Sequence, residues 1–208
     1  MRVVITGASR GIGAALADSY RAAGADVDGT TRADVDFEHA DSIAAWAETQ
    51  KAPIDLLVCN AGLFLDRGHN LEGGYPPEIW AQQFAVNVTG VFLAIQHLLP
   101  RLREAEAAKI AIISSQMGST ERAPGGSYIY RASKAAVTNL GRNMAADLKP
   151  EGISVGVYHP GWVRTDMGGP TAEISTEEAR DGLMARFAAL SIATTGCFET
   201  WDGRPHAY

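Results

Sequence analysis

Short apolar runs alternate with helical patterns along this 208-residue chain, and this alternation restricts the possible folds more than any other feature. The apolar runs have the length of strands and lie at residues 2–6, 25–30, 54–59, 109–115, 153–158 and 196–200. Amphipathic helical patterns lie at residues 14–23, 41–50, 77–103, 127–148 and 175–190. Alternating strands and helices pack as a parallel sheet covered on both faces. We therefore expect one α/β domain over residues 1–208.

The first apolar run leads into a glycine-rich turn and then a helix. It ends at Gly7, and the turn Gly7-Ala-Ser-Arg-Gly-Ile-Gly13 follows. A helix N-terminus presents free N–H groups and a positive dipole end to an anion. Gly11 and Gly13 are expected to let the backbone approach a pyrophosphate closely. The order of strand, turn and helix predicts a nucleotide site on a Rossmann-like, doubly wound sheet, at the carboxyl ends of the strands.

A Tyr-x-x-x-Lys pair, Tyr130 and Lys134, lies within the helical pattern of residues 127–148. Side chains four residues apart share one face of a helix. A free phenol titrates near pH ~10, and a neighbouring ammonium lowers that pKa by favouring the phenolate. The pair therefore predicts an acid/base group, although the same spacing also arises by chance on solvated helices. Tyr128 lies on another helical face and is the weaker candidate.

Composition argues against several classes of function. A net charge of −6 and a pI near 5.3 argue against a nucleic-acid surface. No apolar run reaches the length of a membrane span, and Met1 leads directly into the first strand, so we expect no signal peptide and a cytoplasmic protein. The 2 cysteines and 5 histidines show no spacing typical of metal ligands. The sequence therefore predicts no metal.

Several motifs, in order, resemble those of the short-chain dehydrogenase/reductases, and the resemblance covers nearly the whole chain. Thr6–Gly13 is similar to the family's cofactor turn, and Pro160–Thr165 resembles the segment that closes on the nicotinamide. The segments HPGWVRTDMGGP, YRASKAAVTN and FETWDG look most like the C-factor/sniffer-type carbonyl reductases. The resemblance implies a catalytic set of Asn87, Ser115, Tyr130 and Lys134.

Cofactor choice depends on the end of the second strand. Relatives that use NAD generally carry an acidic residue there, where this chain has Thr31 and then Arg32. Arginine can bind a 2′-phosphate in a charge-assisted fork, and Arg10 is a second cation. We expect NADP(H) to be preferred over NAD(H), unless both arginines are merely solvated charges. The implied cofactor contacts are Gly7, Ser9, Arg10, Gly11, Ile12, Gly13, Thr31, Arg32, Asp34, Val35, Asn60, Ala61, Gly62, Tyr130, Lys134, Pro160, Gly161, Val163 and Thr165.

The segment after the second strand is unusually short. Asp34-Val35-Asp36 resembles the start of the family's third strand, which normally follows a helix. A parallel neighbour needs a crossover of about a dozen residues, and Ala33 alone cannot supply one. We therefore expect the third strand and its preceding helix to be lost or vestigial. The sheet would have about six strands, in the family order 2-1-4-5-6-7.

The candidate serine is slightly farther from Tyr130 in sequence than in many relatives. Pro124, Gly125 and Gly126 form part of a loop that can absorb extra residues. Ser115 ends the apolar run, whereas Ser114 should point to the opposite face of the sheet. A substrate pocket or simple packing would account equally well for Gln116, Met117, Trp162 and Met167, and His159 is better explained as a structural residue.

The leading hypothesis is an NADP(H)-dependent carbonyl reductase or alcohol dehydrogenase acting on a small molecule. In reduction Tyr130 would protonate the carbonyl oxygen while Ser115 donates a hydrogen bond to it. Asn87 would support a water chain, or it would only kink a long helix. One alternative is a signalling or regulatory nucleotide-binding protein of C-factor type with little turnover. Another is a family member whose activity is impaired by the short connection after the second strand. We expect a homodimer, or a homotetramer, through the helices at 77–103 and 127–148.

Overall fold

A computed structural model describes all 208 residues and contains one six-stranded sheet in which every neighbouring pair is parallel. The order is β2-β1-β3-β4-β5-β6, which is the predicted order 2-1-4-5-6-7 when the lost third strand is counted. The strands are β1 (Arg2–Ile5), β2 (Asp26–Gly29), β3 (Leu56–Cys59), β4 (Lys109–Ile113), β5 (Ser154–His159) and β6 (Phe198–Thr200).

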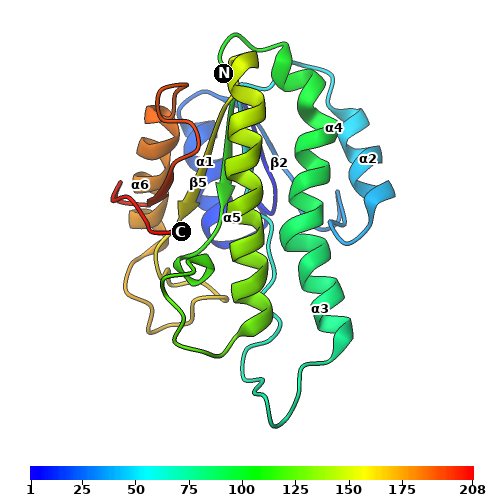
Figure 1. Ribbon diagram of the computed structural model, residues 1–208. Coiled ribbons are helices and arrows are strands. Elements are labelled where there is room, and N and C mark those ends of the chain that lie inside the picture. The colour runs from blue at the N-terminus through cyan, green and yellow to red at the C-terminus, as the bar shows by residue number, and fades with distance from the viewer.

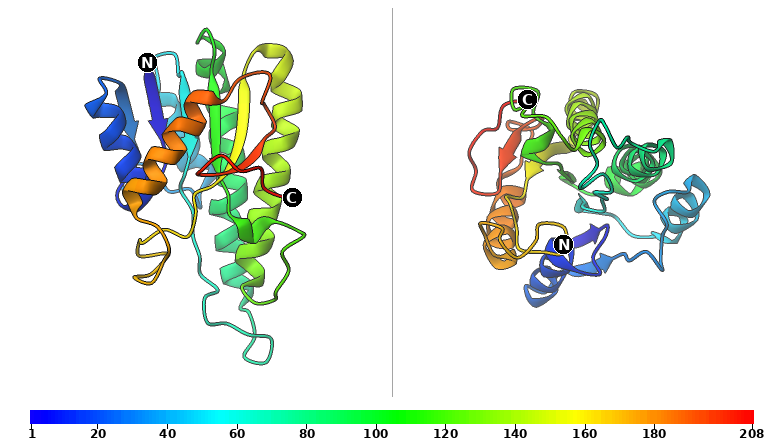
Figure 2. Two further views of the ribbon diagram at one scale, coloured as in Figure 1. Left: turned by 90° about the vertical axis from the view of Figure 1, so that its left-hand side faces the viewer. Right: turned by 90° about the horizontal axis from the view of Figure 1, so that it is seen from below.

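Two layers of helices enclose the sheet (Figures 1 and 2). The first layer is α1 (Gly11–Ala22) and α6 (Thr176–Ala189), and the second contains α2 (Ala40–Thr49), α4 (Val91–Arg103) and α5 (Tyr128–Leu148). Successive strand residues point to opposite faces. Val3 and Ile5 therefore pack with α1 and α6, whereas Val4 joins the larger core on the side of α2, α4 and α5.

The predicted loss of the third strand is confirmed, because residues 30–39 contain no strand and α2 follows them directly. The β2 strand is therefore an edge of the sheet. Its Asp26 pairs with Arg2 at 2.5 Å, and Asp28 accepts a hydrogen bond of 2.5 Å from Gln50 at the end of α2. Turns replace the missing elements and carry the chain past the ends of β2 and β1.

Residues 77–103 are helical throughout, as the sequence pattern predicts, although a π-helical turn interrupts the α-helix. The segment consists of α3 (Pro77–Phe84), a π-helical turn (Ala85–Gly90) and α4. Such turns occur frequently at functional sites, and this one contains Asn87. Close packing also constrains the turn, since a Cβ on Gly90 would lie 2.9 Å from the carbonyl oxygen of Phe37.

No helix in the structure combines the length and the apolar character needed to cross a membrane. Both cysteines are free thiols, with Cys59 in the core and Cys197 partly buried. No three histidine, cysteine or acidic side chains gather in a way that could hold a metal ion.

Candidate active site

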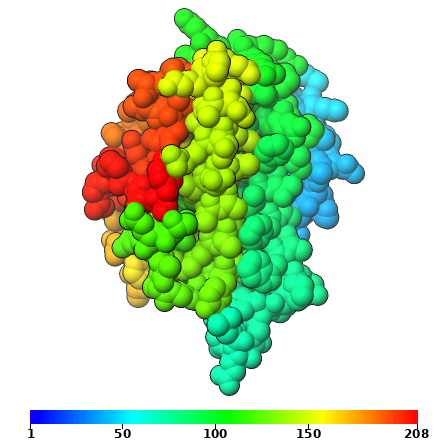
Figure 3. All heavy atoms as spheres, in the orientation of Figure 1, coloured from blue at the N-terminus to red at the C-terminus, as the bar shows by residue number.

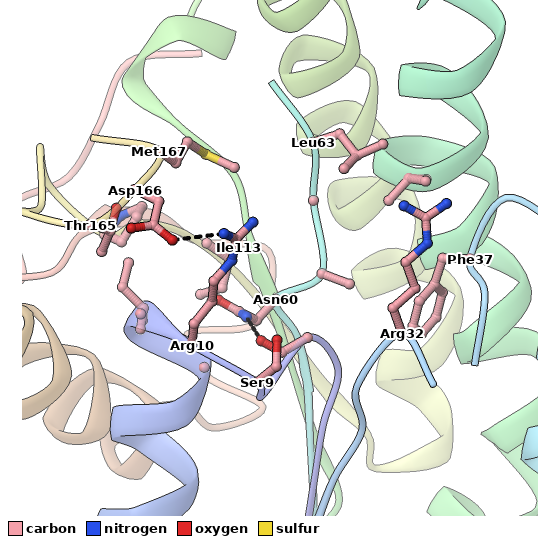
Figure 4. Close-up of a pocket in the computed structure, with 18 of the residues that line it drawn as sticks. Ser9, Arg10, Arg32, Phe37, Asn60, Leu63, Ile113, Thr165, Asp166 and Met167 are labelled. Carbon is pink, nitrogen blue, oxygen red and sulfur yellow. Dashed lines mark hydrogen bonds and ion pairs between the residues drawn. The ribbon is translucent and has the colours of Figure 1, made fainter. Parts of the chain in front are cut away.

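A cavity of about 530 Å³ lies beyond the carboxyl ends of the central strands. Figure 4 shows the glycine turn on one side of it and Arg32 with Phe37 on another. The predicted residues that line it are Gly7, Ser9, Arg10, Gly11, Ile12, Gly13, Thr31, Arg32, Val35, Asn60, Ala61, Gly62, Tyr130, Lys134, Pro160 and Thr165. Asp34, Gly161 and Val163 were predicted as cofactor contacts, but they do not line this cavity.

Asp34 lies outside the cavity, and its carboxylate closes a turn with Thr31. It accepts hydrogen bonds from the Thr31 backbone N–H at 2.7 Å and the Thr31 hydroxyl at 2.8 Å. These bonds lower the pKa of Asp34. The shortened connection therefore turns the side chain back toward β2, away from the position expected of an adenine contact.

The glycine turn is held against the end of β3 by Thr6 and Asn60. The Asn60 amide donates to the carbonyl oxygens of Thr6 at 3.1 Å and Gly7 at 3.0 Å. A Cβ on Gly13 would lie 2.2 Å from the Gly7 oxygen and 2.5 Å from the Asn60 amide nitrogen. Close packing of the helix on the turn therefore explains why residue 13 is a glycine. The sequence predicts a different reason, namely close approach of the backbone to a ligand.

The N-terminus of α1 fits an anionic group. No side chain caps this helix, whose first residue Gly11 has a φ of +56° and follows the exposed Arg10. The uncapped N–H groups carry the positive end of the helix dipole. A pyrophosphate could accept hydrogen bonds from them, which is the fit expected of a dinucleotide.

Tyr130 and Lys134 project from the first turns of α5 into the same cavity. Their exposed fractions are 7% and 5%. The ammonium of Lys134 donates to the carbonyl oxygen of Ile113 at 2.9 Å and lies 5.7 Å from the centre of the Tyr130 ring. Ser115 lies close enough to Tyr130 to favour the phenolate and lower the phenol's pKa.

Burial controls the titration of both groups. Desolvation raises the pKa of Tyr130 to about 12, while the nearby Ser115 hydroxyl opposes the rise. Desolvation also lowers the pKa of Lys134 to about 8. In the free protein the phenol pKa is therefore raised, contrary to the prediction, because burial outweighs the influences that lower it. The Lys134 ammonium donates instead to a strand-end carbonyl. At neutral pH the phenol is a proton donor.

Ser115 is placed by the short helical turn Gln116–Gly118 that follows β4, since its Oγ accepts from the Met117 backbone N–H at 3.1 Å. Ser114 lines the cavity, yet its hydroxyl is occupied by the Lys134 carbonyl at 3.0 Å and Thr138 at 2.7 Å. Ser115 therefore remains the better hydroxyl donor for a substrate oxygen.

Asn87 holds the segment after β3 in place. Its Oδ1 accepts from the Leu63 N–H at 2.7 Å, and its Nδ2 donates to the Leu63 carbonyl at 2.9 Å and to Ser133 at 3.0 Å. The side-chain amide is fully engaged by protein groups. Because the Asn87 amide is occupied, a water chain that starts near this residue would have to begin at a main-chain group of the π-helical turn.

Asp66 is a buried residue beside the site that sequence reasoning missed. It is fully buried and accepts hydrogen bonds from the N–H groups of Ile129 at 2.8 Å and Tyr130 at 3.3 Å. It thus caps α5, whose preceding residue Ser127 makes no side-chain cap. Phe64, in the same loop, stacks on the Tyr130 ring with centroids 4.2 Å apart. Residues in this irregular loop carry no motif, so only their position in space identifies them.

Both predicted cofactor arginines are paired with carboxylates. Arg10 contacts Asp166 at 2.7 Å across the cavity (Figure 4). Arg32 contacts Glu38 at 2.9 Å and Asp36 at 3.6 Å. Sequence reasoning did not assign these three acids, nor the other lining residues Phe37, Leu63, Val86, Ile113, Arg164, Met167 and Thr176, to the cofactor site.

Comparisons with known proteins agree with this geometry. The family model for the short chain dehydrogenases matches residues 30–175. The chain is 35% identical to the C-signal protein of Myxococcus xanthus over 73% of this chain and 90% of that protein. It is 31% identical to 1-hydroxy-2-glutathionyl-2-methyl-3-butene dehydrogenase of Rhodococcus sp. (strain AD45), over 97% of this chain and 96% of that enzyme.

Among solved structures, an NADPH-bound carbonyl reductase from chicken fatty liver superimposes with a TM-score of 0.88 and 25% identity, over 100% of this chain and 98% of that one. The family match, the parallel sheet and the Ser115, Tyr130 and Lys134 arrangement at its carboxyl edge point to one conclusion. The chain is a member of the short-chain dehydrogenase family of oxidoreductases, similar to carbonyl reductases.

Proposed function

We propose that this chain interconverts a carbonyl and an alcohol by hydride transfer with NADP(H), and that Tyr130 is the general acid and base. The observation that carries the proposal is the placement of buried Tyr130 and Lys134 in a cavity that fits a dinucleotide, with Ser115 close enough to lower the phenol's pKa. A bound reduced nicotinamide would supply the hydride to the carbonyl carbon.

The remaining steps belong to side chains of this chain. The Tyr130 phenol donates its proton to the carbonyl oxygen as the C=O double bond becomes a C–O single bond. Ser115 donates a hydrogen bond to the same oxygen while negative charge develops there. The Lys134 ammonium stabilises the phenolate that remains until a proton returns from solvent. Asn87 maintains the wall of the site through Leu63.

The pH dependence of reduction follows from the free protein's groups, because kcat/KM reports their pKa values. Tyr130, with a pKa near 12, stays protonated through neutral pH, whereas Lys134 loses its charge at about pH 8. We expect kcat/KM to be level between pH 6 and pH 7 and to fall as pH rises through about 8. Initial rates of NADPH oxidation at fixed ionic strength measure this. An increase in kcat/KM above pH 8 would contradict the role given to Lys134.

The preference for NADP(H) rests on Arg32 and Arg10. The arginine side chains are exposed, at 69% for Arg32 and 76% for Arg10, while the Glu38 side chain is 19% exposed. Exposed pairs contribute about 0–1 kcal/mol, whereas a hydrogen bond to a charged group contributes about 1.5–3 kcal/mol. A 2′-phosphate can therefore displace Glu38 from Arg32.

We expect wild-type kcat/KM to be higher with NADPH than with NADH, and Arg32→Ala to lower that ratio by about 10- to 100-fold. Glu38→Gln should raise the ratio, because it removes a negative charge next to the phosphate position. Steady-state kinetics with both cofactors give these ratios. Arg21→Ala, on the exposed side of α1, serves as the control. A wild-type preference for NADH would contradict the cofactor assignment.

The similarity to the C-signal protein supports a second candidate, a nucleotide-binding signalling or regulatory protein with little turnover. Reduction of a panel of aldehydes, ketones and quinones distinguishes the two. Saturable NADPH binding without turnover on any of them would favour the second candidate. A chain that bound neither dinucleotide would be a relative impaired by the short connection after β2.

We further propose that residues 1–208 act as one domain, that the protein is cytoplasmic, and that it forms a homodimer through α3, α4 and α5. Trp80 and Phe92 are 37% and 40% exposed on these helices and would be buried by a two-fold contact. Light scattering during size-exclusion chromatography should give twice the 22.1 kDa chain mass. A tetramer is the alternative, and a monomeric mass would contradict both.

A further inference from the structure

A second cavity, of about 460 Å³, lies beside the carboxyl end of β5 and shares no lining residue with the cofactor cavity. The loop after β4, the segment after β5 and the C-terminal segment form its walls. In Figures 1 and 3 the C-terminal segment lies against the loop after β4, where the Thr120 hydroxyl donates to the Tyr208 carbonyl at 2.7 Å. Gln116, the residue after Ser115, lines this cavity.

The cavity contains a buried imidazole without a partner. His159, the last residue of β5, is 8% exposed and lines the cavity, and its Nδ1 is buried without a hydrogen bond. Leaving such a polar atom unsatisfied costs about 1–3 kcal/mol. The buried Nδ1 is out of reach of a ligand, so Nε2, which is neither buried nor hydrogen-bonded, is the ring nitrogen that faces the cavity.

Positive charge surrounds that imidazole. Arg122 and Arg204 line the cavity, and their charges join burial and His206 in lowering the pKa of His159 to about 3, while Asp202 opposes them. His159 is therefore neutral at pH 7. Arg204 contacts Asp202 at 2.8 Å. The guanidinium of Arg122 donates to the amide oxygen of Gln116 and forms no ion pair. Glu173 is the one acid in the lining, and because Asp202 pairs with Arg204, Arg122 is the guanidinium without a carboxylate partner at the cavity.

A few apolar side chains interrupt a lining that is otherwise largely polar. They include Trp162, Trp201, Ile174 and Pro205. The Trp162 indole N–H is held by the Gly168 carbonyl at 2.8 Å, which fixes its ring beside the cavity. Aromatic walls combined with a few convergent polar groups are typical of small-molecule sites.

We infer that this second cavity binds a small organic carboxylate with a flat apolar body. The carboxylate accepts hydrogen bonds from Arg122 and from the protonated nitrogen of His159, and the body packs between the tryptophans. The inference does not depend on the reductase activity. It adds a ligand site that adjoins the catalytic strand ends, since His159 precedes Pro160 and Gln116 follows Ser115.

Benzoate and its neutral analogue benzamide test this site. Calorimetry and tryptophan fluorescence should show saturable benzoate binding to the NADPH-saturated protein, at least tenfold tighter than benzamide. Arg122→Gln with Arg204→Gln should weaken benzoate binding at least tenfold, whereas Arg21→Gln on α1 should leave it unchanged. Both cavity arginines are exposed, so the double variant is expected to fold. Absence of saturable binding, equal affinity for benzamide, or an unaffected double variant would each overturn the inference.

A second comparison identifies the source of the carboxylate. If the carboxylate belongs to the substrate, 4-carboxybenzaldehyde should be reduced with a higher kcat/KM than benzaldehyde, and the double variant should lose the difference. If it belongs to a separate ligand, the two aldehydes should react alike while benzoate still binds. Because benzoate binding is measured without turnover, a failure of the proposed reductase activity would leave this test intact.

Discussion

Tyr130→Phe is expected to lower kcat/KM for carbonyl reduction by about 10²–10⁴-fold, the range typical of losing a positioned general acid. The variant keeps the ring that stacks on Phe64 at 4.2 Å and removes only the hydroxyl. NADPH affinity should change little, because the cavity lining is otherwise retained. Single-turnover rates with a reactive aldehyde, together with a separate cofactor titration, measure the two quantities.

Tyr128→Phe is the matched control for this experiment. Tyr128 lies on the same helix but is 38% exposed and packs edge-on against Tyr75. Tyr128 does not line the cofactor cavity, so we expect turnover within about twofold of wild type. If Tyr130→Phe retained near-normal turnover, or if Tyr128→Phe lost as much, the assignment of the general acid would be wrong.

Asp66→Ala is expected to lower the free energy of unfolding by about 2–4 kcal/mol, because two buried N–H groups at the start of α5 lose their acceptor. Those groups belong to Ile129 and Tyr130. Asp66→Asn keeps one acceptor oxygen and should lose less. Urea unfolding followed by circular dichroism gives the values. Ser175→Ala, which removes the exposed cap of α6, should cost about 1 kcal/mol.

The same Asp66 variants test positioning of the active site. The loop that contains Asp66 also carries Phe64, so its release should disturb the Tyr130 ring and lower kcat more than NADPH affinity. If Asp66 were only a structural cap, its replacement would reduce stability and leave the kcat of the folded fraction unchanged. That result, or a stability loss no greater than for Ser175→Ala, would contradict a positioning role for Asp66.

Local patterns in the sequence were sufficient for the sheet and most of the cofactor cavity. The strand order followed from the family resemblance, and the loss of the third strand from the short connection at Ala33, which cannot hold a crossover. The glycine turn, Asn60 and the Tyr130–Lys134 pair were also found, because each depends on residues that are close in sequence. Strand ends in a parallel sheet meet at one edge, so these local motifs converge in space.

The sequence could not predict contacts between segments that lie far apart along the chain. Asp66 meets α5 across 63 residues, and no spacing rule links the two. Glu38 became a partner of Arg32 only because the lost strand brought the turn close to β2. The sign of the Tyr130 pKa shift depended on how deeply the packed loop buries the phenol. It also depended on the direction of the Lys134 ammonium, which donates to a strand-end carbonyl. Asn87 lies in a π-helical turn that helical periodicity does not reveal.

The exposed edge at β2 has a consequence for self-association in the test tube and the cell. An uncovered edge strand offers unpaired N–H and C=O groups to another chain and can template aggregation. This edge is only four residues long and carries Asp26 and Asp28, whose charges would repel the same strand of a second molecule. Replacing both with valine would create a β-branched, uncharged run at the margin of the sheet. The two acids therefore act as gatekeepers of solubility at the place where the fold was shortened.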